Sequence, residues 1–372
     1  MKNAGLYIHI PFCKSKCLYC DFNSYAKSES LIEPYFSALF EEIKIQSRRY
    51  HKWYDTVYFG GGTPTVVDPE HICDTLSLLK QCFEITSDAE ITAECNPKTI
   101  DFDRLVKLKN AGINRLSIGL QSTHDAFLQK LGRIHSFEDF KECFQNARAA
   151  GFKNISLDLM YGLPDMTLSD WGNTLDEAVD FKAEHISCYS LKVEEGTPFW
   201  NMELNLPDDD LVADMYDLAV EKLENTGYRR YEISNFAKGN KVSKHNEKYW
   251  QCDDFLGLGA GAFSCMDGKR FSNALGILEY IKKIEKNKSA EIMREDLSKF
   301  DLMSEFVFLG LRMTEGIREE EFSSRFGEKI DEVFGEALEK YIKTGHLIRE
   351  NGNIRFSNEG FFVSNIILSD FV

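Results

Sequence analysis

The chain has 372 residues, of which 43% are hydrophobic and 28% are charged, a balance typical of globular proteins. Its 60 acidic and 44 basic residues give a net charge of -16, which argues against a general nucleic-acid-binding protein because phosphate contacts need a surplus of Lys and Arg. No stretch approaches the roughly 20 consecutive apolar residues of a membrane-spanning helix. The opening residues lack a signal-peptide cleavage site, so we expect a cytoplasmic protein of two domains.

Six short apolar runs in the first 195 residues predict strands that are buried on both faces. They cover residues 5–12, 55–62, 89–97, 114–122, 153–163 and 184–194. Longer amphipathic stretches between them predict helices, among them 31–50, 136–151 and 168–182. Alternating strands and helices indicate parallel β/α units with right-handed crossovers. Six such units predict an α/β fold with a partial six-stranded barrel, rather than the eight strands of a complete barrel.

Unusual residues follow the carboxyl ends of these predicted strands, where parallel sheets bind their ligands. A group of cysteines follows the first strand. The next four strands end at residues 60–64 (GGGTP), 94–97 (ECNP), 119–122 (GLQS) and 158–164 (DLMYGLP). We therefore expect one site at this edge of the sheet.

The remainder of the chain predicts a mostly helical C-terminal domain that resembles a winged helix. After a helix at 208–227, the pattern gives three helices and a hairpin that turns at Asn351-Gly352. Within residues 291–372, 17 acids outnumber 10 bases, so a packing or partner domain is favoured over DNA binding. We expect boundaries that divide the chain into residues 1–235, 236–290 (a connecting segment) and 291–372.

Three cysteines within eight positions, Cys13, Cys17 and Cys20, are the strongest chemical signal. Three thiolates can hold three corners of a 4Fe-4S cluster and leave one iron open to a small molecule. Structural zinc usually takes four protein ligands in two pairs, and His9 could supply the fourth only if its side chain pointed out of the first strand. A disulfide is disfavoured by the odd count and the expected compartment. The position of a fourth clustered cysteine is occupied by Phe22.

The stretch LYIHIPFCKSKCLYCDF resembles the opening of the coproporphyrinogen-dehydrogenase (HemN) branch of the radical S-adenosylmethionine superfamily. Within that branch it is most similar to the HemW-type haem chaperones. The resemblance extends over nearly the whole chain through motifs that occur in the same order: GGGTP, ECNP, RLSIGLQS, LGRIH, DLMYGLP, YEISNFAK, HNEKYW and GLGAGAFS.

This resemblance implies that the three cysteines bind a 4Fe-4S cluster whose fourth iron is completed by S-adenosylmethionine. It implies cofactor contacts at eight matching positions: Tyr7, Gly61, Gly62, Thr63, Glu94, Gln121, Arg133 and Asp158. The glycines would bring bare backbone against the methionyl amine, and Arg133 would bind a carboxylate. The alternative for each polar residue is an ordinary strand end, and for the glycines a tight turn.

The motif HNEKYW (245–250) resembles a signature of the haem chaperones and implies that haem is a further ligand, with His245 as the candidate iron ligand. The alternative is that His245 caps or packs a loop. The segment GLGAGA (257–262) fits a dinucleotide fingerprint, but its flanks predict neither a buried strand nor an amphipathic helix. We expect it to pack tightly near the cofactor site.

Two functions remain open from the sequence. The favoured one is a haem chaperone that passes haem to acceptor proteins, which the resemblance suggests include membrane-bound respiratory proteins, with the cluster controlling haem loading or formation of a homodimer. The alternative is an oxygen-independent coproporphyrinogen III dehydrogenase, which would decarboxylate propionates to give protoporphyrinogen IX. Those enzymes typically carry a fourth cysteine where this chain has Phe22, so this activity is in doubt, and whether the protein is an enzyme stays open.

Overall fold

Six parallel strands form the centre of a twelve-stranded sheet in the computed structural model, which describes residues 2–372. These strands lie side by side in chain order and confirm the predicted partial barrel: β1 (Ala4–Ile10), β4 (Trp53–Gly61), β5 (Glu84–Cys95), β6 (Arg115–Gln121), β7 (Ile155–Tyr161) and β8 (His185–Ser190). Apolar side chains such as Leu6, Ile118 and Leu157 are completely buried in them. Each such side chain contributes about 1.5–3 kcal/mol to folding.

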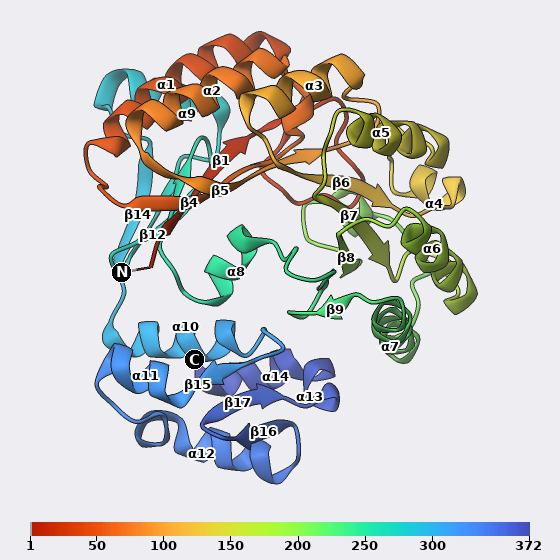
Figure 1. The fold of residues 1–372 in the computed structure, drawn as a ribbon, viewed down its shortest axis with the longest axis vertical. Helices are drawn as coiled ribbons and strands as arrows, with labels where there is room; N and C mark the ends of the chain where they lie inside the picture. The colour runs from red at the N-terminus through yellow and green to blue at the C-terminus, as the bar shows by residue number, and fades with distance from the viewer. Residues whose placement is uncertain (1) are drawn as a thin grey trace.

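Helices cover the outer face of this curved sheet, as Figure 1 shows. They are α1 (Ile32–Ser47), α2 (Pro69–Cys82), α3 (Phe102–Ala111), α4 (Asp125–Lys130), α5 (Phe137–Ala149), α6 (Leu168–Asp180) and α7 (Asp209–Asn225). Local sequence determines where several of them begin. Ser136 and Thr167 form capping boxes at the starts of α5 and α6, which satisfy backbone N–H groups that have no partner inside the helix.

The sheet continues beyond β1 through strands that the sequence analysis did not predict. They are β11 (Phe255–Leu258), which pairs parallel with β1, and the antiparallel β12 (Phe263–Met266), β13 (Lys269–Asn273) and β14 (Glu291–Asp296). The expectation that no buried strand leads into GLGAGA was therefore wrong, because β11 begins at Phe255 and includes the first two residues of the segment. A Cβ on Gly257 would lie 2.0 Å from the Phe263 carbonyl oxygen, so the glycine permits the close hairpin between β11 and β12. A strand rather than a helix follows these glycines, unlike in a dinucleotide-binding motif.

The remaining elements of the barrel lie at its edges, on its inner side and, for one helix, on the outside. They are β2 (Phe12–Cys13), β3 (Tyr25–Ala26), β9 (Arg229–Arg230), β10 (Asn235–Ala237), α8 (Lys244–Trp250) and α9 (Ile277–Asn287). Figure 1 shows α8 inside the curve of the sheet and α9 beside α1 on the outside. Helix α8 carries the HNEKYW motif.

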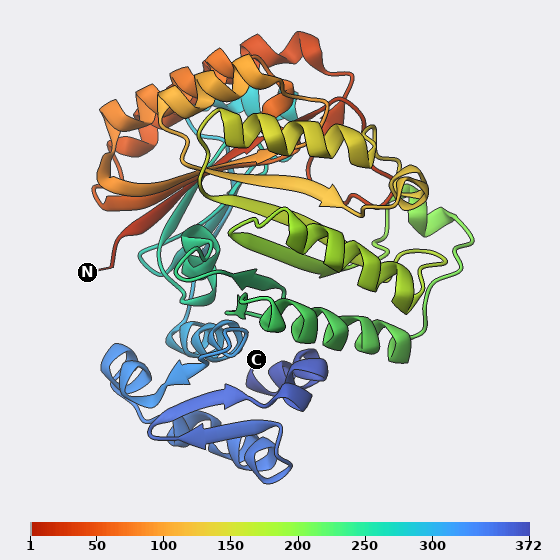
Figure 2. The same ribbon diagram turned by 45° about the vertical axis from the view of Figure 1, so that its right-hand side comes forward.

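The C-terminal domain contains the three predicted helices and the predicted hairpin. Its elements are α10 (Lys299–Gly310), β15 (Ile317–Arg318), α11 (Glu319–Phe326), α12 (Ile330–Lys343), β16 (Leu347–Glu350), β17 (Asn353–Phe356), α13 (Asn358–Phe362) and α14 (Ser364–Leu368). Asn351 and Gly352 both have positive φ, as a two-residue hairpin turn requires. Figure 2 shows this domain below the open side of the barrel.

The two domains have separate hydrophobic cores. The buried apolar residues of the barrel core extend from Ala4 to Ala290, and those of the second core extend from Met303 to Phe371. Residues 256–290, within the expected connecting segment, thus contribute to the barrel core, while the boundaries themselves stay a prediction. None of the helices within residues 2–372 combines the length and the apolar character needed to cross a membrane.

Candidate cluster and cofactor site

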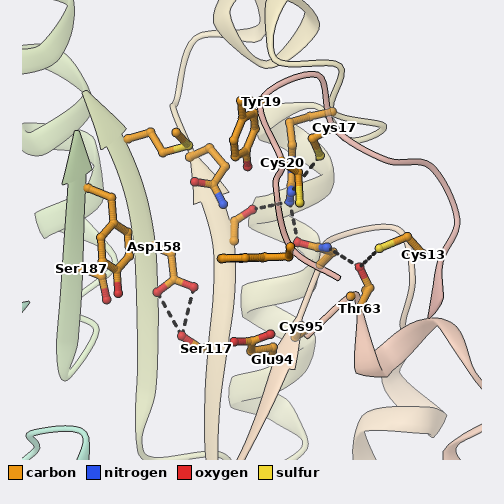
Figure 3. Close-up of a pocket in the computed structure, with 18 of the residues that line it drawn as sticks. Cys13, Cys17, Tyr19, Cys20, Thr63, Glu94, Cys95, Ser117, Asp158 and Ser187 are labelled. Carbon is orange, nitrogen blue, oxygen red and sulfur yellow. Dashed lines mark hydrogen bonds between the residues drawn. The ribbon is translucent and has the colours of Figure 1, made fainter. Parts of the chain in front are cut away.

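The carboxyl ends of the parallel strands surround a cavity of about 420 Å³, shown in Figure 3. This volume lies in the range of small-molecule binding sites. Nine of the twelve predicted site residues line it: Cys13, Cys17, Cys20, Gly62, Thr63, Glu94, Gln121, Arg133 and Asp158. Residues from four different strand ends, from the cysteine loop and from the segment after α4 therefore meet in one place.

The cysteine loop presents three free, half-buried thiols to this cavity. Figure 3 shows Cys17 and Cys20 close together, with Cys13 apart from them and next to Thr63. The backbone N–H of Leu18 donates to the Leu131 carbonyl oxygen at 3.0 Å and holds the loop against the segment after α4. Burial raises the pKa of the Cys13 and Cys20 thiols, so these groups are neutral until a bound metal displaces their protons.

The donor set fits an iron-sulfur cluster with one open corner. Three sulfur ligands lie on one wall, and the cavity continues past them. A structural zinc site would need a fourth protein ligand beside these three cysteines. His9 does not join the cysteines, because its Nε2 lies 2.8 Å from the Asn23 carbonyl oxygen and its Nδ1 lies 3.0 Å from the Tyr7 hydroxyl.

Gly61 and Gly62 connect β4 to the back of the cysteine loop. Gly61 has φ +114°, and a Cβ there would lie 2.5 Å from the His9 ring. A Cβ on Gly62 would lie 2.7 Å from the Phe12 carbonyl oxygen, and the Gly62 N–H donates to the Ile10 carbonyl oxygen at 2.8 Å. The tight-turn explanation therefore holds for both glycines. Only Gly62 also lines the cavity.

Glu94, on β5, places a carboxyl group in the cavity wall. It accepts hydrogen bonds from the Tyr58 hydroxyl at 2.9 Å and from the Gly61 N–H at 3.1 Å. Burial raises the pKa of Glu94 to about 7. The group therefore changes charge near neutral pH, and its ionised form is suited to a cationic ligand group such as an ammonium.

Asp158, on β7, points toward Ser117 in Figure 3. The Ser117 hydroxyl lies 3.0 Å from both of its carboxyl oxygens, and the Ser156 hydroxyl lies 3.3 Å from one of them. Burial raises the pKa of Asp158. A carboxylate held in this way can accept further hydrogen bonds from ligand hydroxyls.

Arg133 joins the cysteine loop to the strand ends. One Nη lies 3.6 Å from the Cys17 sulfur, and the other donates to Asn96 Oδ1 at 2.5 Å and to the Gly119 carbonyl oxygen at 2.9 Å. Its buried Nε has no hydrogen-bond partner among the described residues. Gln121 lies nearby with φ +66°, a conformation that non-glycine residues adopt rarely.

Arg115 is a cavity residue that the sequence analysis missed. It is 2% exposed and lines the cavity next to Ser117. The available signal was a charged residue at the start of the strand RLSIGLQ, which is otherwise uncharged. Strands that are buried on both faces rarely contain a charged residue unless it has a polar partner or a functional role.

Tyr7, Gly61 and His245 lie outside the cavity lining, so the ligand contacts expected of these three residues stay predictions. Tyr7 stacks against the rings of Tyr58 and His245. His245 is 1% exposed, with its Nδ1 2.8 Å from Thr56 Oγ1 and its Nε2 2.9 Å from the Tyr249 hydroxyl. Burial lowers the pKa of His245 to about 3, so the ring is neutral, and both of its nitrogens are engaged. These contacts match the packing alternative for His245, and its role as a haem ligand stays a prediction.

The GLGAGA segment supports the cysteine loop from behind and does not line the cavity. A Cβ on Gly259 would lie 2.7 Å from the His9 carbonyl oxygen, and one on Gly261 would lie 2.4 Å from Asn23 Nδ2. The Asn23 amide donates to the Ala260 carbonyl oxygen at 3.1 Å. The small residues therefore permit close backbone packing under the loop.

Comparisons with known proteins agree with this geometry. Residues 7–178 match the model of the radical SAM superfamily, and residues 297–363 match the HemN C-terminal domain. The chain is 36% identical to "Heme chaperone HemW" of Bacillus subtilis over 378 residues, which cover 100% of this chain and 99% of that protein. It is 38% identical to the protein of the same name in Escherichia coli, over 69% of each chain.

A mitochondrial relative and a solved structure extend the comparison. The chain is 33% identical to "Radical S-adenosyl methionine domain-containing protein 1, mitochondrial" of Mus musculus, over 98% of this chain and 86% of that protein. The structure of coproporphyrinogen III oxidase (HemN) from Escherichia coli matches with a TM-score of 0.89 and 23% identity, over 99% of this chain and 90% of that chain. This structural likeness shows a shared fold.

Proposed function

The chain belongs to the HemW family of the radical SAM superfamily, and from this membership we propose that it is a haem chaperone that binds haem and delivers it to acceptor proteins. The observation that carries the proposal is the identity of 36% over the whole chain with a curated haem chaperone, including the C-terminal domain. The 4Fe-4S cluster and S-adenosylmethionine are its further cofactors, and the 420 Å³ cavity is where we place them.

In this site each group of residues has a separate task. Cys13, Cys17 and Cys20 would hold the cluster, which when bound and reduced by an external electron donor would supply reductive cleavage of the sulfonium bond of S-adenosylmethionine. Ionised Glu94 attracts an ammonium group, and Asp158 accepts hydrogen bonds from ribose hydroxyls. Arg133 keeps the loop that carries Cys17 at a constant position relative to the strand ends.

Coproporphyrinogen III dehydrogenase activity is the second candidate, because the solved HemN structure shares the fold. Phe22 argues against it. Its ring is 63% exposed and lines the cavity at the position where those enzymes typically carry a fourth cysteine. An aromatic ring cannot act as a soft metal ligand or a thiol donor.

One anaerobic experiment separates the two functions. Protein with a reconstituted cluster is incubated with dithionite, S-adenosylmethionine and coproporphyrinogen III, and a second portion is titrated with haemin. We expect no protoporphyrinogen and a saturable Soret band. Protoporphyrinogen formation in proportion to the protein would refute a chaperone-only function, and failure to bind haemin would refute the chaperone itself.

We further propose a cytoplasmic location, a homodimer as the loaded form, and membrane-bound respiratory proteins among the acceptors. These finer statements rest on the family resemblance. Size-exclusion chromatography with and without cluster, S-adenosylmethionine and haem tests the dimer. An elution volume that does not change would contradict it.

A further inference from the structure

A chain of buried hydrogen bonds begins at Asp158, in the wall of the cluster cavity. β7 and β8 pair so that Ser156 lies beside His185. The Ser156 hydroxyl lies 3.3 Å from Asp158 Oδ1 and 2.7 Å from His185 Nδ1. On the other side of the imidazole, His185 Nε2 lies 2.9 Å from the Tyr231 hydroxyl, which accepts from the Ser243 backbone N–H at 3.1 Å. The chain thus connects the cavity to the residue that directly precedes α8.

The last group of this chain determines the direction of every hydrogen bond in it. The Ser243 backbone N–H can only donate, so the Tyr231 oxygen is its acceptor and the Tyr231 O–H donates to His185 Nε2. A neutral imidazole that accepts at Nε2 carries its proton on Nδ1, and this N–H donates to the Ser156 oxygen. The Ser156 O–H is then left to donate to Asp158. All four hydrogen bonds therefore donate in the direction of the Asp158 carboxylate.

The opposite tautomer of His185 satisfies fewer groups. With the proton on Nε2, the Tyr231 oxygen would face two donors, and its own O–H would have no acceptor among the hydrogen bonds of residues 2–372. Ser156, His185, Tyr231 and Ser243 are each at most 2% exposed, so solvent does not replace a lost partner. Burial lowers the pKa of His185 well below its usual range, which keeps the ring neutral.

We propose that His185 and Tyr231 are positioning residues for Asp158, which hold the Ser156 hydroxyl toward the carboxylate and so keep it oriented for S-adenosylmethionine. The inference deepens the proposed function and rests on it, because it uses the assignment of Asp158 to the ribose hydroxyls. An ionised carboxylate has about four acceptor sites, so the hydroxyls of Ser117 and Ser156 leave sites free for a ligand. His185 acts through Ser156 rather than on the ligand itself.

The far end of the chain lies where the two domains meet. The Tyr231 carbonyl oxygen accepts from the Thr314 N–H, in the C-terminal domain, at 3.0 Å. Figure 1 shows α8 between the barrel sheet and α10, and the two helices are in contact. Tyr231 is thus bonded to the C-terminal domain by its backbone and to the cofactor site by its side chain. A displacement of that domain would change the orientation of Asp158, and binding at Asp158 would stabilise the arrangement of the two domains in return.

The first test measures S-adenosylmethionine binding calorimetrically on protein with a reconstituted cluster. Tyr231→Phe leaves Nε2 of His185 free to take the proton, after which Ser156 donates to His185 instead of Asp158. We expect binding about three- to tenfold weaker, the usual effect of one lost hydrogen bond. Tyr228→Phe is the matched control and should bind as the wild type does, because the buried Tyr228 hydroxyl donates to the Ala183 carbonyl oxygen, at 2.7 Å, outside this chain.

Two substitutions of His185 separate the position of the donor from simple packing. Asn places an amide N–H close to the position of Nδ1, whereas Gln places one close to Nε2. Only His185→Asn can therefore donate to Ser156, and we expect it to retain more affinity for S-adenosylmethionine than His185→Gln. Packing alone would favour Gln, which fills more of the space of the imidazole. Equal losses in the two variants, or a greater loss in His185→Asn, would overturn the positioning role.

The second test determines the direction of the chain in metal-free protein without ligand. Nitrogen-15 NMR of protein with labelled histidine distinguishes protonated from unprotonated ring nitrogens, and His185→Asn identifies the signals of His185. We expect the proton on Nδ1 in the wild type and a shift toward Nε2 in Tyr231→Phe. A wild-type His185 with its proton on Nε2 would refute the proposed direction.

The outcomes distinguish this inference from the proposed function. If Tyr231→Phe binds S-adenosylmethionine as tightly as the wild type does, the positioning role is wrong and the chaperone function stands. If the wild type binds no S-adenosylmethionine, the positioning role is wrong together with the cofactor site, and the haemin titration alone decides the chaperone function. Iron content should be the same in all these variants, because none of them changes the cysteine loop.

Discussion

The substitution Glu94→Gln should change the stability of the metal-free protein in a pH-dependent way. Burial raises the pKa of Glu94 from its ordinary value of 4.5 to about 7. The folded state therefore holds a proton that the unfolded state has lost, and stability falls as pH rises from 4.5 to 7. With about 1.4 kcal/mol for each pKa unit, this corresponds to about 3 kcal/mol. Gln cannot ionise, so the variant lacks this loss.

The assay compares thermal unfolding of wild type and variant, both free of cluster and S-adenosylmethionine, between pH 4.5 and 8. An unfolding entropy of about 2.1 cal/mol/K per residue converts 3 kcal/mol into about 4 °C, by which the difference in Tm should move in favour of the variant as pH rises. Gln leaves one of the two donors, Tyr58 or Gly61, without its carboxylate acceptor, and this cost does not depend on pH. A Tm difference that is constant across the range would refute the reasoning.

A matched variant separates the general effect of burial from the role in the site. Glu42 is 1% exposed, burial raises its pKa to about 7, and it accepts hydrogen bonds from Tyr280 and Gly259 outside the lining of the cluster cavity. Glu42→Gln should show the same pH trend in Tm. Only Glu94→Gln should also weaken S-adenosylmethionine binding, measured calorimetrically on protein with a reconstituted cluster.

Two further predictions concern the cysteine loop and its support. Cys17→Ala should abolish most iron loading in anaerobic reconstitution. Cys188→Ala, which removes a buried thiol outside the cavity, should load iron as the wild type does. Equal iron content in the two variants would contradict the assignment of the cysteines to the cluster. Gly62→Ala should lower the free energy of unfolding by about 1–3 kcal/mol, because its Cβ would lie 2.7 Å from the Phe12 carbonyl oxygen, and chemical denaturation measures this. Gly335→Ala is its control, since a Cβ at Gly335 would lie 3.8 Å from Asp331 Cβ, an ordinary contact.

The sequence alone was sufficient for elements whose signal is local. The runs that became β1, β4, β5, β6, β7 and β8 are apolar because both faces of a parallel strand are buried, and this composition is visible without knowing the partner strand. The cysteine spacing is local in the same way, as are the capping residues Ser136 and Thr167 and the Asn351-Gly352 turn.

Other features depended on contacts between distant parts of the chain, and no local pattern encodes such contacts. β11 is four residues long and is a strand because it pairs with β1, about 250 positions earlier. His245 belongs to the HNEKYW motif, but the motif does not show that the side chain is buried with hydrogen bonds to Thr56 and Tyr249. A cavity between the barrel and the C-terminal domain combines residues near positions 2, 52, 253 and 323. The periodicity of a segment predicts which of its faces is buried. It does not predict which other segment covers that face, and the cavities form only where helices and strands pack together.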